Sequence, residues 1–138
     1  MDYSKYAKYS QKELKSKAIR VFNSWIRKRD DGLGCISCGS LNQIQAGHFY
    51  SAGKHDSMRF EEDNVNSQCK HCNYFMSGNL LNYRKNLINK IGLERVERLD
   101  MLAEMNKRTR NHKWDRFTLI HIIEKYKPCK KKLSQLSK

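Results

Sequence analysis

Apolar side chains recur at helical spacing along residues 11–29, three and four positions apart on one face. Just before them, Ser10 and Glu13 have the spacing of a capping box, in which each side chain satisfies a free backbone amide at a helix start. An Asp-Asp-Gly turn follows at residues 30–32. We therefore predict a helix over residues 11–29 whose apolar face is formed by Leu14, Ala18, Val21, Phe22, Trp25 and Ile26.

The same spacing predicts three more helices, over residues 79–90, 93–107 and 114–127. Gly92 and Pro128 stand where the first and the last of these helices would end. The side chains expected to face inward are Leu80, Leu81, Leu87, Ile88 and Ile91 on the first helix, Val96, Leu99 and Leu102 on the second, and Phe117, Ile120, Ile123 and Tyr126 on the third.

Between residues 34 and 78, short apolar runs are broken by Gly, Asn and Ser, which is typical of brief strands and turns. Strands set between helices predict an α+β fold. A chain of 138 residues and 16.4 kDa has room for one domain with a modest core. We accordingly predict a single domain, residues 1–138, with a basic N-terminal helix (10–29), a core (30–92), C-terminal helices (93–128) and a basic tail (129–138).

The formal net charge is +14, and most of the excess lies at the two ends of the chain. Residues 1–29 carry nine basic and two acidic side chains, and residues 125–138 carry six lysines and no acid. Basic arms beside a nearly neutral centre suit a polyanion such as DNA, although such charge also serves solubility. Arg20, Arg27 and Lys28 on the first helix are the candidate phosphate contacts.

No apolar run approaches the 20 or so residues that a membrane-spanning helix needs. The first residues also lack the apolar stretch of a signal peptide. We therefore expect no membrane association and a cytoplasmic protein. Because conditions there are reducing, we expect no disulfide framework for the five cysteines.

Four cysteines fall into two C-x2-C pairs, which is the spacing of a tetrahedral thiolate site. We predict structural Zn²⁺ there, with an iron–sulfur centre or a redox-active pair as the alternatives. The 30 residues between the pairs exceed the 15–20 of a simple zinc ribbon, so a further element is inserted. Cys129 is expected to be a free thiol. The predicted zinc ligands are Cys35, Cys38, Cys69 and Cys72.

The inserted segment and its flanks resemble the HNH, or ββα-metal, nucleases, and most of all the phage recombination endonuclease family NinG (Rap), which is similar to endonuclease VII. The resemblance covers about residues 20–100. It rests on Trp25-Ile26-Arg27, Arg29-Asp30, Cys35-Ile36-Ser37-Cys38-Gly39, Ala46-Gly47-His48-Phe49-Tyr50, Met58-Arg59-Phe60, Asn64, Gln68-Cys69, Cys72-Asn73, Ser77-Gly78-Asn79 and Tyr83-Arg84.

The resemblance implies a zinc-bound HNH-like core and a role for each polar residue in it. His48 would be the general base, since imidazole titrates near neutrality and can take a proton from water. Asn73 would offer its amide oxygen to a catalytic Mg²⁺ or Mn²⁺, which needs few protein ligands. Asn64 would fix the loop that aims His48, and Arg59 and Arg84 would contact phosphates.

Each of these residues also has a plainer interpretation. His48 could be a structural hydrogen-bond partner, Asn64 a turn residue and Asn73 a helix N-cap. Arg59 could instead pair with the acidic residues 61–63.

The sequence departs from the family pattern at Gly47, where many relatives place a metal-binding Asp. That departure leaves the second ligand of the catalytic ion open. Asp63 is one candidate for it.

By resemblance, we expect a metal-dependent DNA endonuclease that cuts branched recombination intermediates such as Holliday junctions and D-loops. It would act on branched double-stranded DNA as a homodimer, because symmetric cutting takes two active sites, and would be encoded by a phage or prophage. Two other functions stay open: a non-catalytic zinc-stabilised module that binds nucleic acid, and an adaptor that binds protein partners.

Overall fold

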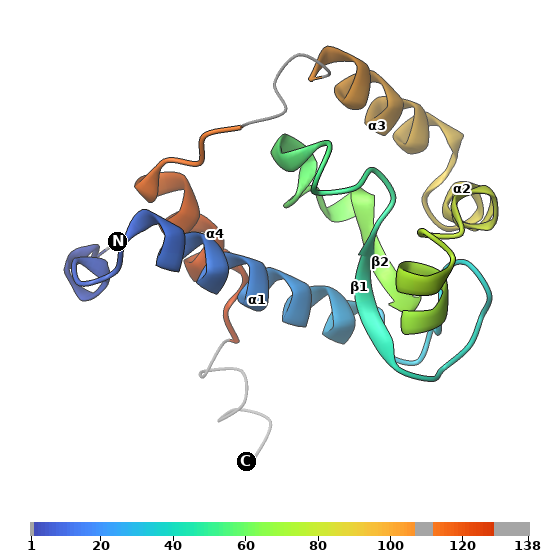
Figure 1. The fold of residues 1–138 in the computed structure, drawn as a ribbon, viewed down its shortest axis with the longest axis horizontal. Coiled ribbons are helices and arrows are strands. Elements are labelled where there is room, and N and C mark those ends of the chain that lie inside the picture. Colours follow the sequence, from blue (N-terminus) through green and yellow to red (C-terminus); the bar gives the residue numbers. More distant parts are fainter. Residues whose placement is uncertain (1, 107–111, 129–138) are drawn as a thin grey trace. The chain divides into compact units, whose positions relative to one another are not determined.

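The computed structural model describes residues 2–106 and 112–128 (Figure 1). The chain divides into two compact units, one made of Met1–Trp25 with Trp114–Lys138 and the other of Ile26–Lys113. The helix α1 (Gln11–Arg29) runs from the first unit into the second. The one domain expected from chain length thus corresponds to two compact units, each with buried apolar side chains of its own.

The predicted first helix is confirmed, because α1 begins at Gln11 and ends at Arg29. Its capping box is formed in both directions. The Ser10 amide donates to the Glu13 carboxylate and the Glu13 amide donates to the Ser10 hydroxyl, each at 3.1 Å. The side chains of the predicted face that are fully buried are Leu14, Ala18, Phe22 and Ile26, while Val21 and Trp25 are half-buried.

In the first unit, α4 (Arg116–Tyr126) is capped by Asp115, whose carboxylate accepts a hydrogen bond from the Thr118 amide at 2.8 Å. The Phe22 and Tyr126 rings meet edge to face with centroids 4.9 Å apart. The prediction that Phe117 faces inward is wrong, since 62% of it is exposed. Leu119 takes an inward position in its place and joins the buried residues Ile120, Ile123 and Tyr126.

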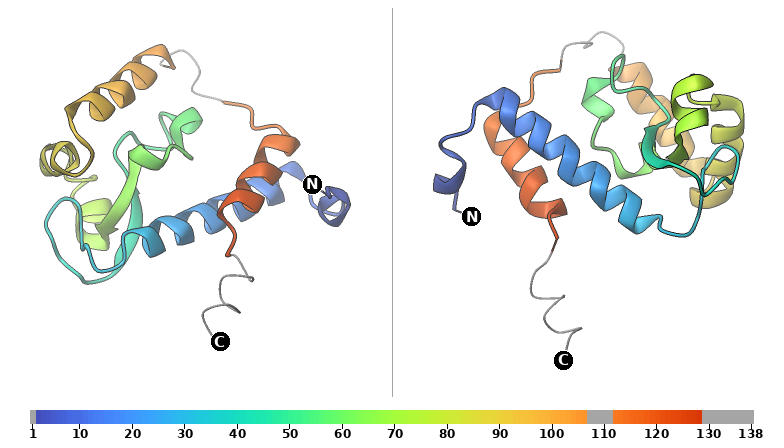
Figure 2. Two further views of the ribbon diagram at one scale, coloured as in Figure 1. Left: turned by 180° about the vertical axis from the view of Figure 1, so that it is seen from behind. Right: turned by 60° about the horizontal axis from the view of Figure 1, so that its bottom comes forward.

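The second unit contains the predicted short strands, β1 (Ile44–His48) and β2 (Val65–Cys69), which form a two-stranded antiparallel sheet. The strands lie side by side in both views of Figure 2. Their register pairs Ile44 with Cys69 and His48 with Val65. The short helical turns η2 (Asp56–Met58) and η3 (Glu62–Asn64) connect the strands, and the π-helical turn η4 (His71–Phe75) follows β2.

Two helices complete this unit, α2 (Leu80–Ile91) and α3 (Leu93–Met105), close to their predicted bounds. The inward placement of Leu80 and Leu81 is wrong, because they are 47% and 89% exposed. The helix instead directs Tyr83 into the core, and Leu81 lies on the opposite side of the helix from it. The buried core comprises Phe49, Met58, Tyr83, Leu87, Val96, Leu99 and Ala103.

A buried carboxylate joins the end of α1 to the sheet and to α2. Asp30 is 2% exposed and accepts hydrogen bonds from the Ser67 amide at 2.9 Å, the Arg29 guanidinium at 2.8 Å and the Lys90 ammonium at 3.0 Å. Burial alone would raise the pKa of Asp30, but these three donors hold it below its ordinary value. The three segments are therefore tied together by one charged group.

None of the described helices is both long enough and apolar enough to span a membrane. Three predicted features lie outside the described residues: the end of the helix over 93–107 at Lys107, the free thiol of Cys129, and the Lys-rich tail of residues 129–138. The described residues thus form an α+β fold, with helices and a small two-stranded sheet, as predicted.

Candidate functional site

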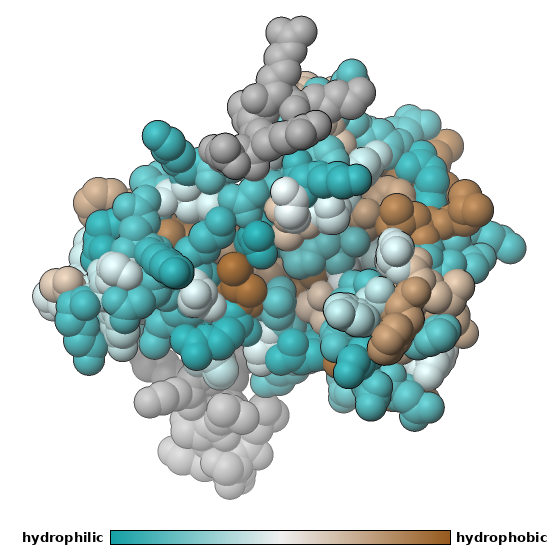
Figure 3. Space-filling model, in the orientation of Figure 1, coloured by the Kyte–Doolittle hydropathy of each residue, from teal (hydrophilic) through white to brown (hydrophobic). Residues whose placement is uncertain are grey.

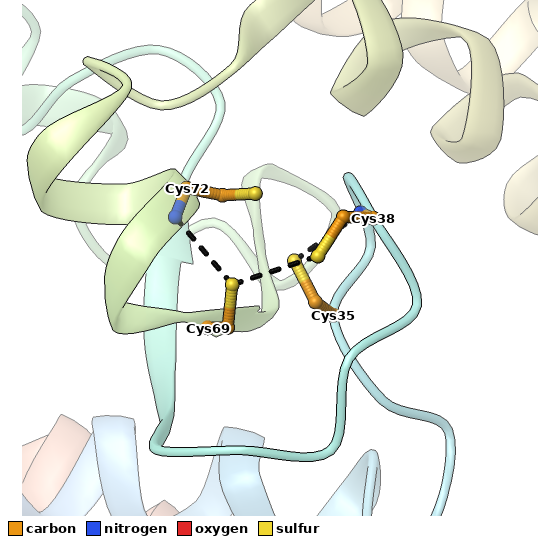
Figure 4. Close-up of side chains that lie close together, drawn as sticks. All are labelled: Cys35, Cys38, Cys69 and Cys72. Atoms are coloured by element: carbon orange, nitrogen blue, oxygen red, sulfur yellow. Dashed lines mark hydrogen bonds between the residues drawn. The ribbon is translucent and has the colours of Figure 1, made fainter.

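The four predicted zinc ligands lie together in the second unit (Figure 4). All four Sγ atoms lie within 4.8 Å of one another, and those of Cys38 and Cys69 are 3.6 Å apart. A ZnS₄ tetrahedron with Zn–S bonds of about 2.3 Å has edges of about 3.8 Å, so the cluster fits a zinc ion. The residues come from the loop before β1 and from the junction of β2 with η4.

Backbone amides surround the sulfur atoms in the way that a thiolate requires. The amides of Ser37 and Cys38 donate to Cys35 Sγ at 3.3 and 3.4 Å, and the Cys72 amide donates to Cys69 Sγ at 3.4 Å. Burial raises the pKa of Cys35, but these and other amides outweigh it and lower the pKa to about 7. Burial raises the pKa of the Cys72 thiol to about 12, so a bound cation is what would keep all four ionised.

Beside this cluster lies an open pocket of about 710 Å³, which we call the His48 pocket. His48 and Asn73 both line it, so the structure brings together the two side chains that the predicted chemistry needs. His48 comes from the end of β1 and Asn73 from η4. The other residues that line the pocket are Ala46, Phe49, Tyr50, Ser51, Ala52, Lys54, His55, Ser77, Gly78, Leu80, Leu81 and Arg84.

The His48 ring is fixed by one hydrogen bond. Its Nε2 lies 3.0 Å from the Arg59 carbonyl oxygen, and because a carbonyl can only accept, Nε2 carries the proton. Nδ1 of the neutral ring is then left with a free lone pair. Burial lowers the pKa of His48 below 6.5, more than the Arg59 carbonyl raises it, so the ring is neutral at pH 7. This is the protonation state that a general base needs.

Asn73 is held by a residue that the sequence did not single out. Its Nδ2 donates to Gln45 Oε1 at 2.9 Å, which orients the amide. Within the described part of the chain, Oδ1 of Asn73 has no hydrogen-bond partner. Asn73 lies next to the cysteine cluster, because Cys72 immediately precedes it. An oriented amide oxygen of this kind is a ligand that Mg²⁺ accepts.

Asn64 is fully buried and ties together the loop that follows His48. Its Oδ1 accepts from the Tyr50 amide at 2.8 Å, and its Nδ2 donates to the carbonyls of Tyr50 and Met58 at 3.0 and 3.3 Å. The Asn64 carbonyl also accepts from the Phe49 amide at 2.8 Å. These bonds match a loop-fixing residue, since they hold the two positions directly after His48.

Packing explains why glycine stands at position 47. A Cβ there would lie 2.0 Å from Oε1 and 2.8 Å from Cβ of Gln68, which is fully buried. The Gln68 amide nitrogen in turn donates to the Ser37 hydroxyl and the Gly78 carbonyl. The Gly47 carbonyl accepts from the Tyr83 hydroxyl at 2.7 Å. An Asp before His48 would therefore need Gln68 to move.

Acidic side chains near the sheet pair with arginines instead of facing the pocket. Asp63 forms an ion pair with Arg95, and Glu61 pairs with Arg98 at 2.9 Å. No carboxylate is found among the described residues that line the His48 pocket. The structure thus places Asp63, the candidate second ligand, away from Asn73.

The two predicted phosphate-binding arginines of this unit are also engaged. Arg59 Nε donates to Asp56 at 2.7 Å, so its partner is not one of the acids at 61–63. Arg84 lines the pocket and binds Asp100 through two hydrogen bonds of 2.9 and 2.8 Å. No sequence motif marks Asp56 or Asp100 as a partner, because the residues around an acid on a helix or turn do not show whether it forms an ion pair.

The remaining basic candidates lie on α1. Arg20, Arg27 and Lys28 are exposed there and do not line the His48 pocket. In the first unit, Arg20 borders a shallow groove of about 580 Å³ with Lys12 and Lys17. These side chains are therefore available to an anionic partner.

The fold and the cysteine cluster define a small α+β protein with a site suited to a metal ion such as zinc. The model of the family described as Bacteriophage Lambda NinG protein matches residues 3–137. The chain belongs to the NinG family.

Named relatives agree with this assignment. The chain is 41% identical over 99 residues to Protein ninG of Escherichia phage 933W, 40% to that of Escherichia phage lambda and 39% to that of Salmonella phage P22. Each match covers 70% of this chain and 46% of the relative, so the chain spans about half the length of these relatives. No solved structure matches the chain.

Proposed function

We propose that this protein is a divalent-metal-dependent DNA endonuclease of the HNH type, with the His48 pocket as its active site. The observation that carries the proposal is the hydrogen bond from His48 Nε2 to the Arg59 carbonyl. That bond leaves Nδ1 as the proton acceptor of a histidine that, like Asn73, lines the pocket. The antiparallel pair β1–β2 followed by the helical turn η4 is the element order expected of a ββα-metal core.

The residues divide the hydrolysis of a phosphodiester between them. His48 Nδ1 takes a proton from water, the resulting hydroxide attacks phosphorus, and the bond from phosphorus to the leaving oxygen breaks. Asn73 Oδ1 would hold Mg²⁺ or Mn²⁺, which when bound stabilises charge on the phosphate and the leaving oxygen. Asn64 keeps the loop after His48 in place, and Lys54 at the pocket adds a positive charge.

The cysteine cluster contributes structure to this scheme. A zinc ion held by the four thiolates would fix both the loop before β1 and the start of η4, and so the position of Asn73. Because His48 follows the first cysteine pair and Asn73 the second, loss of zinc would separate the segments that carry them.

For the substrate, the proposal is branched double-stranded DNA, such as Holliday junctions and D-loops. The net charge of +14 and the exposed basic residues of α1 support contact with several phosphate backbones. Symmetric cutting of a junction takes two active sites, so the proposal includes a homodimer.

A zinc-stabilised module that binds nucleic acid without cutting it is the second candidate. It is favoured by the lack of a carboxylate among the described residues lining the pocket, and by the engagement of Arg59 and Arg84 with Asp56 and Asp100. Both candidates predict DNA binding, and only the first predicts cleavage.

Replacement of the proposed base separates the two candidates. His48→Ala is expected to lower junction cleavage in Mg²⁺ by about 100-fold or more, the usual contribution of a general base, while the junction is still bound. His121→Ala, an exposed histidine of the first unit, is the matched control and should cut at the wild-type rate. Equal cutting by His48→Ala and the wild type would overturn the proposal.

A further inference from the structure

The turn that carries Asn73 continues into a cluster of exposed apolar side chains. Tyr74 and Phe75 are 74% and 67% exposed, and their rings meet edge to face with centroids 5.1 Å apart. We call the whole cluster the apolar rim; it consists of Tyr74, Phe75, Met76, Leu80 and Leu81, each at least 47% exposed.

The apolar rim borders the His48 pocket. Leu80 and Leu81 line that pocket, and Tyr74 directly follows Asn73 in the chain. In Figure 3, brown side chains gather over the part of the molecule that holds η4 and α2 in Figure 1. The core of this unit does not use these side chains, because α2 buries Tyr83 and Leu87 instead. An exposed apolar cluster of this kind marks a contact surface.

The charge of the surrounding chain indicates what that surface contacts. Between Asp63 and Glu94 the sequence has no acidic residue and four basic ones, Lys70, Arg84, Lys85 and Lys90. Arg84 pairs with Asp100 and Lys90 with Asp30, so the exposed Lys70 and Lys85 carry the uncompensated charge of this segment. Two copies of this chain would repel each other if this surface were their interface. An anionic partner with flat apolar groups fits better, and unstacked nucleotides have both a charged phosphate and an apolar base.

We infer that Tyr74 and Phe75 stack on unpaired bases at the branch of a DNA substrate, and that this contact supplies the preference for branched over linear DNA. The inference rests on the proposed function, since the strand whose bases stack there would place a phosphate in the His48 pocket. His71, whose ring lies 6.2 Å from that of Phe75, extends the aromatic surface. A fully paired duplex keeps its bases stacked on one another and gains nothing from these rings.

Binding without cleavage tests the inference. Fluorescence anisotropy, with no divalent ion added, would measure the affinity for a four-way junction, a linear duplex and a single strand of one sequence. The double variant Y74L/F75L keeps apolar side chains but removes the rings, and Y74F/F75Y keeps both rings. Phe117→Leu removes an exposed ring of the first unit and serves as the matched control.

The expected result is a loss of roughly tenfold in affinity of Y74L/F75L for the junction and the single strand, the size of a lost stacking contact. Its affinity for the duplex should change less than about twofold, and Y74F/F75Y and Phe117→Leu should bind like the wild type. An equal loss on all three DNAs, or no loss, would overturn the inference. So would binding of the wild type to phosphatidylglycerol vesicles that Y74L/F75L loses while it keeps full junction affinity.

The two failures can be told apart. The anisotropy measurement reads binding alone, so it gives its answer whether or not the protein cuts DNA. Absence of junction cleavage by the wild type in Mg²⁺ would overturn the proposed function and leave the role of Tyr74 and Phe75 in binding to be judged by anisotropy.

Discussion

His48 and Asn73 are each oriented by one hydrogen bond to a group that no motif marks, the Arg59 carbonyl for the first and the Gln45 amide for the second. In both cases the bond uses an N–H and leaves the opposite atom, Nδ1 or Oδ1, as the one able to act. The roles proposed for His48 and Asn73 therefore depend more on which atom of each side chain donates a hydrogen bond than on the residue types alone.

The pH dependence of cleavage follows from the state of the His48 ring. Burial lowers its pKa below 6.5, so the neutral base persists to lower pH than in a free histidine. Between pH 8 and 7 the single-turnover cleavage rate should lose little through this group, and it should fall only as pH drops through a pKa below 6.5. A pH–rate profile checks this, and an acid limb above pH 7 would contradict it.

Asn64 offers a residue-scale test of stability. Asn64→Ala leaves the Tyr50 amide and the carbonyls of Tyr50 and Met58 without their buried partner. We expect a loss of about 3 kcal/mol in the free energy of unfolding, measured by urea denaturation. Asn89→Ala, an exposed position on α2, is the control and should change it by less than about 0.5 kcal/mol. Equal effects of the two substitutions would show that Asn64 does not hold the loop.

At the scale of elements, local signals in the sequence are sufficient to predict the approximate bounds of the helices. The bounds of α1 follow from the capping box of Ser10 and Glu13, because its partners are three residues apart. The inward side of α2 was misassigned at Leu80 and Leu81, since apolar spacing alone does not tell a buried face from an exposed apolar rim. The cysteine pairs were predictable because metal ligands impose a fixed spacing.

Contacts between distant segments were beyond sequence reasoning. The Arg84–Asp100 pair joins two different helices, and Gln45 meets Asn73 across 28 positions. Nothing in the residue types distinguishes these partners from the other acids and amides of the chain. Arg59 and Arg84 each bind a carboxylate from a segment that no motif marks, so the sequence predicts their phosphate contacts but not these ion pairs.

The zinc knuckles can be tested as an element. Cys72→Ser removes a buried ligand, and the apparent binding energy of structural zinc, roughly 10–16 kcal/mol, is at least as large as the stability of a typical domain. We expect the variant to lose bound zinc, measured by atomic emission, together with cooperative thermal unfolding of the second unit. Cys129→Ser, at the predicted free thiol, should retain both. A stable Cys72→Ser protein without zinc would refute a structural role for the metal.

The junction of α1, β2 and α2 gives a second test at this scale. Asp30→Ala removes the carboxylate that pairs with Arg29 and Lys90 and accepts from the Ser67 amide. Because the partners stay in place without their counter-charge, the free energy of unfolding should fall by about 3 kcal/mol. Asp31→Ala at the neighbouring exposed position should be nearly neutral in the same urea titration. A neutral result for Asp30→Ala would mean that this charged group does not tie the segments together.

At the scale of the whole molecule, the family is shown by the sequence match, whereas the mechanism is a proposal. The match over residues 3–137 places the chain in the NinG family, while the 99 residues aligned with each curated relative are 46% of that relative. Nuclease chemistry is proposed from the pocket, and the preference for branched DNA from the basic residues and the apolar rim. The proposals share one requirement, which is that a DNA strand enters the His48 pocket.

Cleavage of a labelled four-way junction, compared with a linear duplex of the same sequence, measures that requirement most directly. With Mg²⁺ the wild type should nick the junction near its branch and leave the duplex largely intact, and His48→Ala should cut neither. A wild-type protein that binds the junction and never cuts it in Mg²⁺ or Mn²⁺, or a His48→Ala variant that cuts as fast as the wild type, would contradict the assignment of His48 as the base.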